Sequence, residues 1–149
     1  MKLRILVPVD FEEPVSWEGV QPMLRQVAKG NEVEITVVTV VPKLGTVIAQ
    51  AAQAAPFISS APEEMKEKAL ALASGRLHQI VDTEEFGEIQ YVVRSGSVYS
   101  KVLETAEEAK VNLILIMSHI PDLGDYLLGP NAAKIVRHAK CSVLAVRPE

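Results

Sequence analysis

The stretch LILIMSHIPDLGDYLLGPNAA, residues 113–133, contains the pattern that decides the fold. Its first five residues are all apolar, and a short apolar run of this length is typical of a buried β-strand. A more polar loop follows, and the stretch then reaches Gly129-Pro130, where a proline in the first turn favours the start of a helix. The order of strand, loop and helix predicts one unit of an α/β domain.

Four further runs rich in β-branched residues lie outside this stretch, with segments of helical spacing between them. We expect strands at residues 3–9, 33–41, 89–93, 113–117 and 142–146. We expect helices at residues 15–29, 63–81, 98–109 and 131–139. Pro22 lies inside the first of these helices and predicts a kink or a restart there.

This alternation predicts a single α/β domain over residues 1–149. Right-handed crossovers between parallel strands place helices on both faces of an open sheet. We expect five parallel strands in the order 3-2-1-4-5, with a ligand site at the switch point between the first and fourth strands, in the loops after Asp10 and Met117. Residues 45–62 are expected to form a flexible loop or lid, with a disordered segment or a short helix as alternatives.

The composition limits the classes of function. The chain of 149 residues is 48% hydrophobic and has a net charge of −4, which disfavours nucleic-acid binding because phosphate contacts require a basic face. The one cysteine, Cys141, cannot form an intramolecular disulfide, so we expect a reducing compartment. No apolar run approaches the roughly 18 residues of a membrane span, and the first apolar run is too short for a signal peptide. We therefore expect a cytoplasmic protein that binds neither nucleic acid nor membrane.

Several common catalytic and cofactor motifs are absent from the sequence. It has no P-loop, no dinucleotide fingerprint after the first strand, no nucleophile elbow and no Cys/His cluster with zinc spacing. Arg94-Ser95 follows the third predicted strand, where a response regulator needs an aspartate. We therefore assign no catalytic residue and no metal ligand.

Five motifs are spread over the whole chain. They are Val7-Pro8-Val9-Asp10, Val93-Arg94-Ser95-Gly96-Ser97, NLILIMSH at 112–119, LLGPNA at 127–132 and VRHAKCSVLAVR at 136–147. Together these motifs resemble the universal stress protein (UspA-like) family, and the LLGPNA motif with its short loop is most similar to the branch that contains the bacterial stress proteins F and G. The resemblance implies a fold of the adenine-nucleotide alpha hydrolase-like type.

The resemblance also implies an adenine-nucleotide site at the switch point. The candidate binding residues are Pro8, Val9, Asp10, Val40, Val41, Met117, Ser118, His119, Gly129, Pro130 and Asn131. Nucleotide-binding members carry G-x2-G-x9-G-[ST] here, because glycines let backbone N–H groups approach phosphate oxygens. In this chain Met117 and Ile120 stand at the first two glycine positions. Gly129 is kept, Pro130 replaces the hydroxyl residue, and the loop is one residue shorter.

Charge along the same loop opposes a triphosphate. Residues 111–133 hold no Lys or Arg but include Asp122 and Asp125, and His119 is the one cationic candidate. Tight ATP binding, weak binding of adenosine or AMP, and a loop with no ligand are the alternatives, so we assign no cofactor and keep ATP or AMP as a weak candidate. Asp10 is either a hydrogen-bond acceptor for a nucleoside or a cap for the first helix.

The last predicted strand lies at a sheet edge, and an exposed apolar edge favours pairing with another strand. The resemblance implies a homodimer in which this strand pairs with its copy across a two-fold axis. The candidate interface residues are Val143, Leu144, Ala145, Val146 and Arg147.

Three hypotheses for function follow from these observations. The first is a dimeric universal stress protein with a degenerate adenine-nucleotide pocket, which acts by binding or sensing rather than by catalysis. The second is an ATP-binding stress protein with slow ATPase or autophosphorylation activity. The third is a module without a small ligand that binds an unidentified protein partner through residues 45–62.

Overall fold

The computed structural model describes residues 2–11, 15–41, 43–54, 62–118 and 130–147. In chain order the elements are β1 (Lys2–Pro8), α1 (Val15–Ala28), β2 (Glu32–Val41), α2 (Leu44–Ala54), α3 (Pro62–Ile80), β3 (Ile89–Ser95), α4 (Val98–Glu108), β4 (Leu113–Met117), α5 (Pro130–His138) and β5 (Ser142–Val146). Every strand and helix expected from the sequence is present, with each end within two residues of its expected place.

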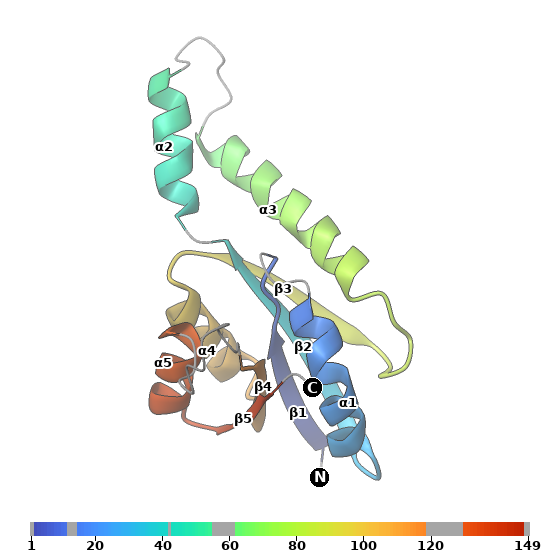
Figure 1. Ribbon diagram of the computed structural model, residues 1–149. Helices are drawn as coiled ribbons and strands as arrows, with labels where there is room; N and C mark the ends of the chain where they lie inside the picture. The colour runs from blue at the N-terminus through green and yellow to red at the C-terminus, as the bar shows by residue number, and fades with distance from the viewer. Residues whose placement is uncertain (1, 12–14, 42, 55–61, 119–129, 148–149) are drawn as a thin grey trace.

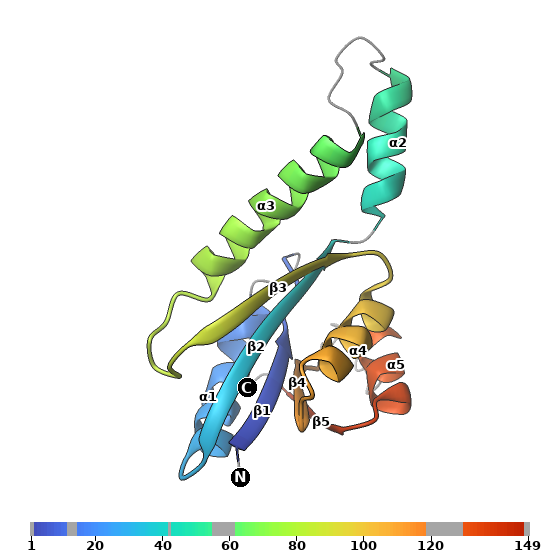
Figure 2. The ribbon, with the colours of Figure 1, turned by 180° about the vertical axis from the view of Figure 1, so that it is seen from behind.

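The five strands form one parallel sheet in the order β3-β2-β1-β4-β5, which confirms the predicted class and topology (Figure 1). Helices α1 and α3 pack on one face of the sheet, and α4 and α5 pack on the other, as Figure 2 shows from behind. The sheet is therefore covered on both sides, as continuous apolar strands require.

The core has two layers because successive residues of a strand point to opposite faces of the sheet. In β1, Ile5 and Val7 pack in the α1 and α3 layer, whereas Leu6 packs in the α4 and α5 layer. All three side chains are fully buried. The same alternation in β4 places Leu115 in the first layer and Ile114 in the second.

Helix α1 runs through Pro22 as one helix, so the predicted restart does not occur. The helix ends before Gly30, whose φ of +77° is a left-handed conformation that glycine adopts without strain. The side-chain amide Nδ2 of Asn31 donates to the carbonyl oxygen of Val27 (2.9 Å) and satisfies one of the last carbonyls of the helix.

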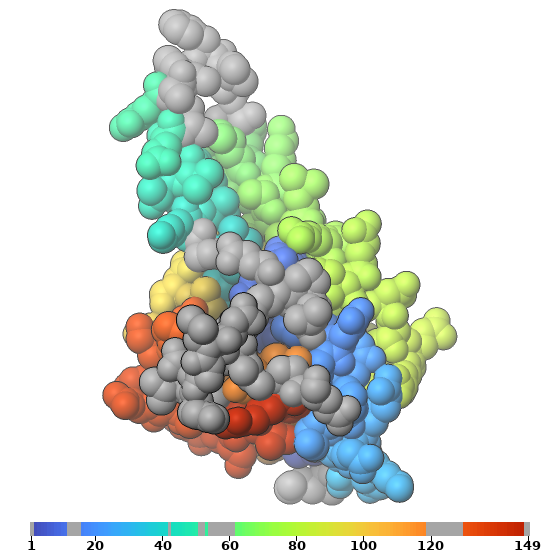
Figure 3. Space-filling model, in the orientation of Figure 1, coloured from blue at the N-terminus to red at the C-terminus, as the bar shows by residue number. Residues whose placement is uncertain are grey.

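Residues 44–54 form α2, so the short-helix alternative holds for this part of the 45–62 segment, and residues 55–61 lie outside the described residues. Helix α2 packs against α3. Helix α2 and the N-terminal part of α3 extend beyond the end of the sheet (Figure 1), and the same residues project from the rest of the molecule in Figure 3. Leu44 and Ile48, four residues apart on one face of α2, are buried, whereas Val47 is exposed. A role for this hairpin as a lid stays a prediction.

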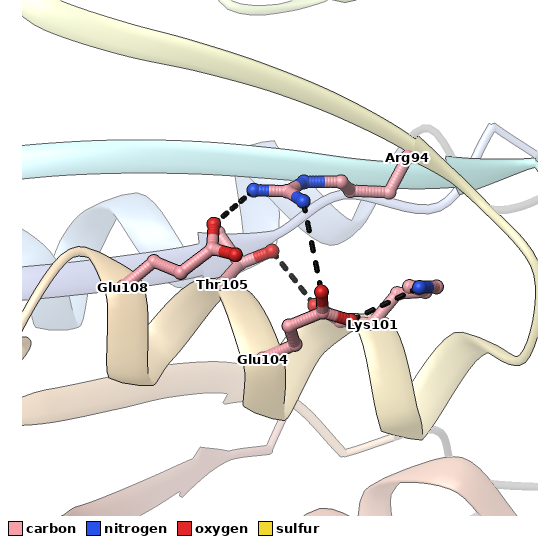
Figure 4. Close-up of polar contacts among 5 residues, drawn as sticks. All are labelled: Arg94, Lys101, Glu104, Thr105 and Glu108. Atoms are coloured by element: carbon pink, nitrogen blue, oxygen red, sulfur yellow. Dashed lines mark hydrogen bonds and ion pairs between the residues drawn. The ribbon is translucent and has the colours of Figure 1, made fainter.

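A cluster of charged residues joins β3 to α4 (Figure 4). The Arg94 guanidinium pairs with the carboxylates of Glu108 and Glu104, the latter at 3.9 Å. Lys101 donates a 3.0 Å hydrogen bond to Glu104, and this bond lowers the pKa of the Glu104 carboxyl. The position that a response regulator would need for its acceptor aspartate is thus used here in a structural ion pair.

Candidate ligand-binding site

A cavity of about 550 Å³ opens at the carboxyl ends of β1, β2 and β4. The volume lies within the range of about 300–1,000 Å³ that is usual for small-molecule sites. The residues that line the cavity are Pro8, Val9, Asp10, Phe11, Ser16, Val38, Val40, Val41, Arg76, Val98, Val102, Ile116, Met117, Asn131, Ala132 and Ile135. The sheet order reverses between β1 and β4, so the cavity lies at the predicted switch point.

The two sides of the cavity differ in chemistry. The side formed by α4 and α5 is mostly apolar, through Val98, Val102, Ala132 and Ile135, with Asn131 as its polar member. The other side receives polar groups from the turn after β1, from α1 and from α3, namely Asp10, Ser16 and Arg76. A ligand with one flat apolar part and one polar part would match this division.

Backbone hydrogen bonds hold the turn after β1 in place. The Val9 N–H donates to the carbonyl of Val38 (2.8 Å), and the Asp10 N–H donates to the Oγ of the buried Ser16 (3.2 Å). The first bond ties the turn to β2 and the second ties it to α1. The bond to Ser16 uses the backbone of Asp10, so both alternatives for its carboxylate, a nucleoside acceptor or a helix cap, stay predictions.

Met117, at the end of β4, lines the cavity and also contacts α1. A methyl group added at Gly19 would lie 1.5 Å from the Cε of Met117 and 3.1 Å from its Sδ. The thioether therefore occupies the space that the missing side chain of Gly19 leaves on α1. Met117 is thus a partly buried residue that packs against the core beside α1.

Most of the predicted site residues that the structure describes line the cavity. These are Pro8, Val9, Asp10, Val40, Val41, Met117 and Asn131. Ser118 and Pro130 do not line the cavity. Ser118 is buried, and its N–H donates to the carbonyl of Val146 (2.7 Å). Pro130 is exposed and is the first residue of α5. His119 and Gly129 lie outside the described residues, as do Ile120, Asp122 and Asp125.

Sequence reasoning missed several lining residues. The sequence predicts only a helix at residues 98–109, yet Val98 and Val102 of this helix line the cavity; their spacing of four residues and their place after β3 are the signals for this position. Phe11 and Arg76 carry no such local signal in the sequence. Arg76 reaches the cavity from α3, far away in the sequence.

The described residues show no cluster suited to metal-dependent chemistry. Within ranges 2–11, 15–41, 43–54, 62–118 and 130–147, no group of three or more His, Cys, Asp or Glu could hold a metal ion. Cys141 lies away from the cavity, and burial raises the pKa of its thiol, which disfavours the reactive thiolate. In this part of the chain, no helix is long and apolar enough to cross a membrane.

Strand β5 forms one edge of the sheet and pairs with β4 alone among the described strands. Of the predicted interface residues, Val143, Leu144 and Ala145 are half-buried, Val146 is buried and Arg147 is exposed. The edge therefore presents partly covered apolar side chains beside unpaired backbone groups.

The fold and the cavity define a doubly wound α/β domain with a cavity at its switch point. A sequence model of the universal stress protein family matches residues 1–147, so the chain belongs to this family. Universal stress protein G of Shigella flexneri is 40% identical over 77 residues, which are 50% of this chain and 54% of that protein. Universal stress protein G of Salmonella typhimurium is 46% identical over 55 residues, or 37% and 39% of the two chains. The chain thus matches about half the length, or less, of these curated relatives.

Solved structures share the fold over nearly the whole chain. The hypothetical protein MJ0577 is 22% identical with a TM-score of 0.68, over 98% of this chain and 96% of that one. The universal stress protein UspA from Lactobacillus plantarum is 17% identical with a TM-score of 0.62, over 97% of each chain. A universal stress protein solved in complex with cAMP is 20% identical with a TM-score of 0.56, over 99% and 98% of the chains. At these identities the likeness shows the fold.

Proposed function

We propose that this universal stress protein binds an adenine nucleotide of low charge in the switch-point cavity and acts by binding or sensing rather than by catalysis. The observation that carries the proposal is the cavity itself, about 550 Å³ in volume with an apolar wall on α4 and α5. A flat base placed against this wall would remove apolar surface from water. The structural neighbour in complex with cAMP supports an adenine nucleotide as the class of ligand.

The residues of the cavity suit a nucleoside better than a chain of phosphates. Val40 and Val41, at the end of β2, offer apolar surface to a base, and the Asn131 amide offers both a donor and an acceptor. The Asp10 carboxylate can accept hydrogen bonds from ribose hydroxyls. Pro130 has no backbone N–H to give to a phosphate at the start of α5, and Met117 replaces a glycine of the family motif. We therefore describe the pocket as degenerate for ATP.

A pair of neighbouring alanines on α5 offers a matched test. Ala132 lines the cavity, whereas Ala133 is exposed and does not line it. We expect Ala132→Phe to fill the cavity and weaken binding of AMP and cAMP by about tenfold or more in isothermal titration, which equals about 1.4 kcal/mol. We expect Ala133→Phe to bind as the unaltered protein does.

Three outcomes would count against this proposal. Equal binding by both variants would place the ligand elsewhere. A dissociation constant for ATP below about 1 μM would contradict the degenerate pocket. Release of labelled phosphate, or transfer of label from ATP to the protein, would favour a slow ATPase or autophosphorylating protein instead.

We also propose that the protein is a cytoplasmic homodimer that pairs through β5. The apolar edge supports this, because pairing would cover Val143, Leu144 and Ala145 and would satisfy backbone groups of the strand. We expect sedimentation to give the mass of a dimer, and Val143→Lys to give that of a monomer. The control is Val136→Lys, at a 46% exposed position on α5, which should leave the dimer intact. A monomer across the micromolar range for the unaltered chain would rule out the dimer.

A further inference from the structure

Arg76 is the cation that α3 brings to the rim of the switch-point cavity. One guanidinium nitrogen donates to the carbonyl of Phe11 (3.3 Å), and the Cζ lies 4.7 Å from the centre of the Phe11 ring. Both contacts of Arg76 are made to Phe11, the residue that follows Asp10. The guanidinium is therefore held beside the turn after β1, although the Arg76 residue as a whole is exposed.

In the part of the chain that the structure describes, the charges around the cavity leave the Arg76 guanidinium available to an anion. Among the described residues that line the cavity, Arg76 is the one Lys or Arg and Asp10 is the one carboxylate. Within the described residues, no carboxylate forms an ion pair with Arg76. A guanidinium has five N–H donors in a planar fork that matches two oxygens of a phosphate, and the bond to Phe11 uses one of the two terminal nitrogens.

We propose that Arg76 forms an anion subsite that binds the single phosphate of a nucleoside monophosphate, an inference that rests on the proposed nucleotide site. The apolar side of the cavity, on α4 and α5, takes the base, since a phosphate placed there would lose its hydration without a partner. The phosphate then lies on the side where α3 supplies Arg76. The one guanidinium and one carboxylate among the described lining residues balance a single phosphate better than the several charges of a triphosphate.

Adenosine and AMP differ by one phosphate, so the ratio of their dissociation constants isolates the subsite. We expect the unaltered protein to bind AMP about tenfold more tightly than adenosine at low ionic strength, as hydrogen bonds to a charged partner would allow. Arg76→Gln should abolish this preference and leave adenosine binding unchanged. Arg76→Lys should retain part of it, because the point charge stays while the planar fork is lost. The control Lys68→Gln removes a charge from an exposed position on the same helix, away from the cavity lining, and should retain the full preference.

The result also separates this inference from the proposed function. If adenosine binds but AMP shows no preference, or if Arg76→Gln weakens both ligands equally, the anion subsite is wrong and the nucleotide site stands. If neither adenosine nor AMP binds, the nucleotide site fails and the subsite fails with it. The preference should also shrink as salt is raised from about 50 mM to 0.5 M, because the Arg76 cation is exposed to solvent. A preference that does not change with salt would overturn the assignment to this side chain.

Discussion

The contact between Gly19 and Met117 allows a quantitative prediction for the change Gly19→Ala. A methyl group at this position would lie 1.5 Å from the Cε of Met117, far inside van der Waals contact. The clash involves the far end of a flexible side chain, so we expect the Met117 thioether to rotate while α1 stays in place. An alanine within a helix is favoured over glycine by about 0.5–1 kcal/mol, whereas overpacking of a core costs about 1–3 kcal/mol. The net expectation is a loss of about 1 kcal/mol in the free energy of unfolding.

The double-mutant cycle with Met117→Ala decides whether this reasoning is right. Once the thioether is removed, Gly19→Ala should stabilise the protein by about 0.5–1 kcal/mol, because only the helix propensity remains. The coupling between the two changes should therefore be about 1–3 kcal/mol, well above the roughly 0.5 kcal/mol found for independent sites.

Urea unfolding at fixed protein concentration, followed by the fluorescence of Trp17, measures all four variants. Trp17 is the one tryptophan of the chain and is 2% exposed, so its emission reports loss of the core. If Gly19→Ala has the same effect with and without Met117, the thioether does not occupy the space beside α1, and the packing described for Met117 is refuted.

Three further predictions use other parts of the molecule. Leu77→Ala, at a fully buried position of α3, should lower the free energy of unfolding by about 2–5 kcal/mol in the same urea assay. Leu72 is 76% exposed on the same helix, so Leu72→Ala should change the free energy of unfolding by less than about 0.5 kcal/mol. Equal losses would contradict the packing of α3. Arg94→Ala should lower the thermal midpoint of unfolding slightly in dilute buffer and have less effect in about 1 M NaCl, because the ion pairs with Glu104 and Glu108 are partly exposed. A decrease in the midpoint that does not depend on salt would indicate a packing role for Arg94. Burial raises the pKa of the Cys141 thiol above its unfolded value, so the thiol's contribution to stability is present below the unfolded pKa and is lost as the pH rises through the folded pKa. Iodoacetamide should therefore alkylate Cys141 more slowly in the folded chain than in urea at neutral pH. Equal rates of alkylation would contradict the burial of the thiol.

The strands and most helices could be predicted because each depends on a local pattern. The apolar runs of β1 and β4 are continuous since both faces of the sheet are covered, and Gly30 marks the end of α1. Local patterns left alternatives open where tertiary packing decides the outcome. Pro22 predicts a kink or a restart, and α1 continues through it without a restart. Residues 45–62 allow a flexible loop or lid, a disordered segment or a short helix, and residues 44–54 form a helix that packs against α3 and buries Leu44 and Ile48.

The sequence by itself determined the family, the order of the strands and the switch-point loops, because periodicity and short motifs act between residues that are neighbours along the chain. It also located Asp10, Met117 and Asn131, which follow directly from the strand ends and the helix start. Only the tertiary structure decided what surrounds them. Arg76 and Phe11 are 65 positions apart in the sequence, and their contact depends on how α3 packs on the sheet. The contact of Met117 with Gly19 depends on how α1 lies against β4. No local pattern encodes such distances, because they are set by the packing of whole elements against one another.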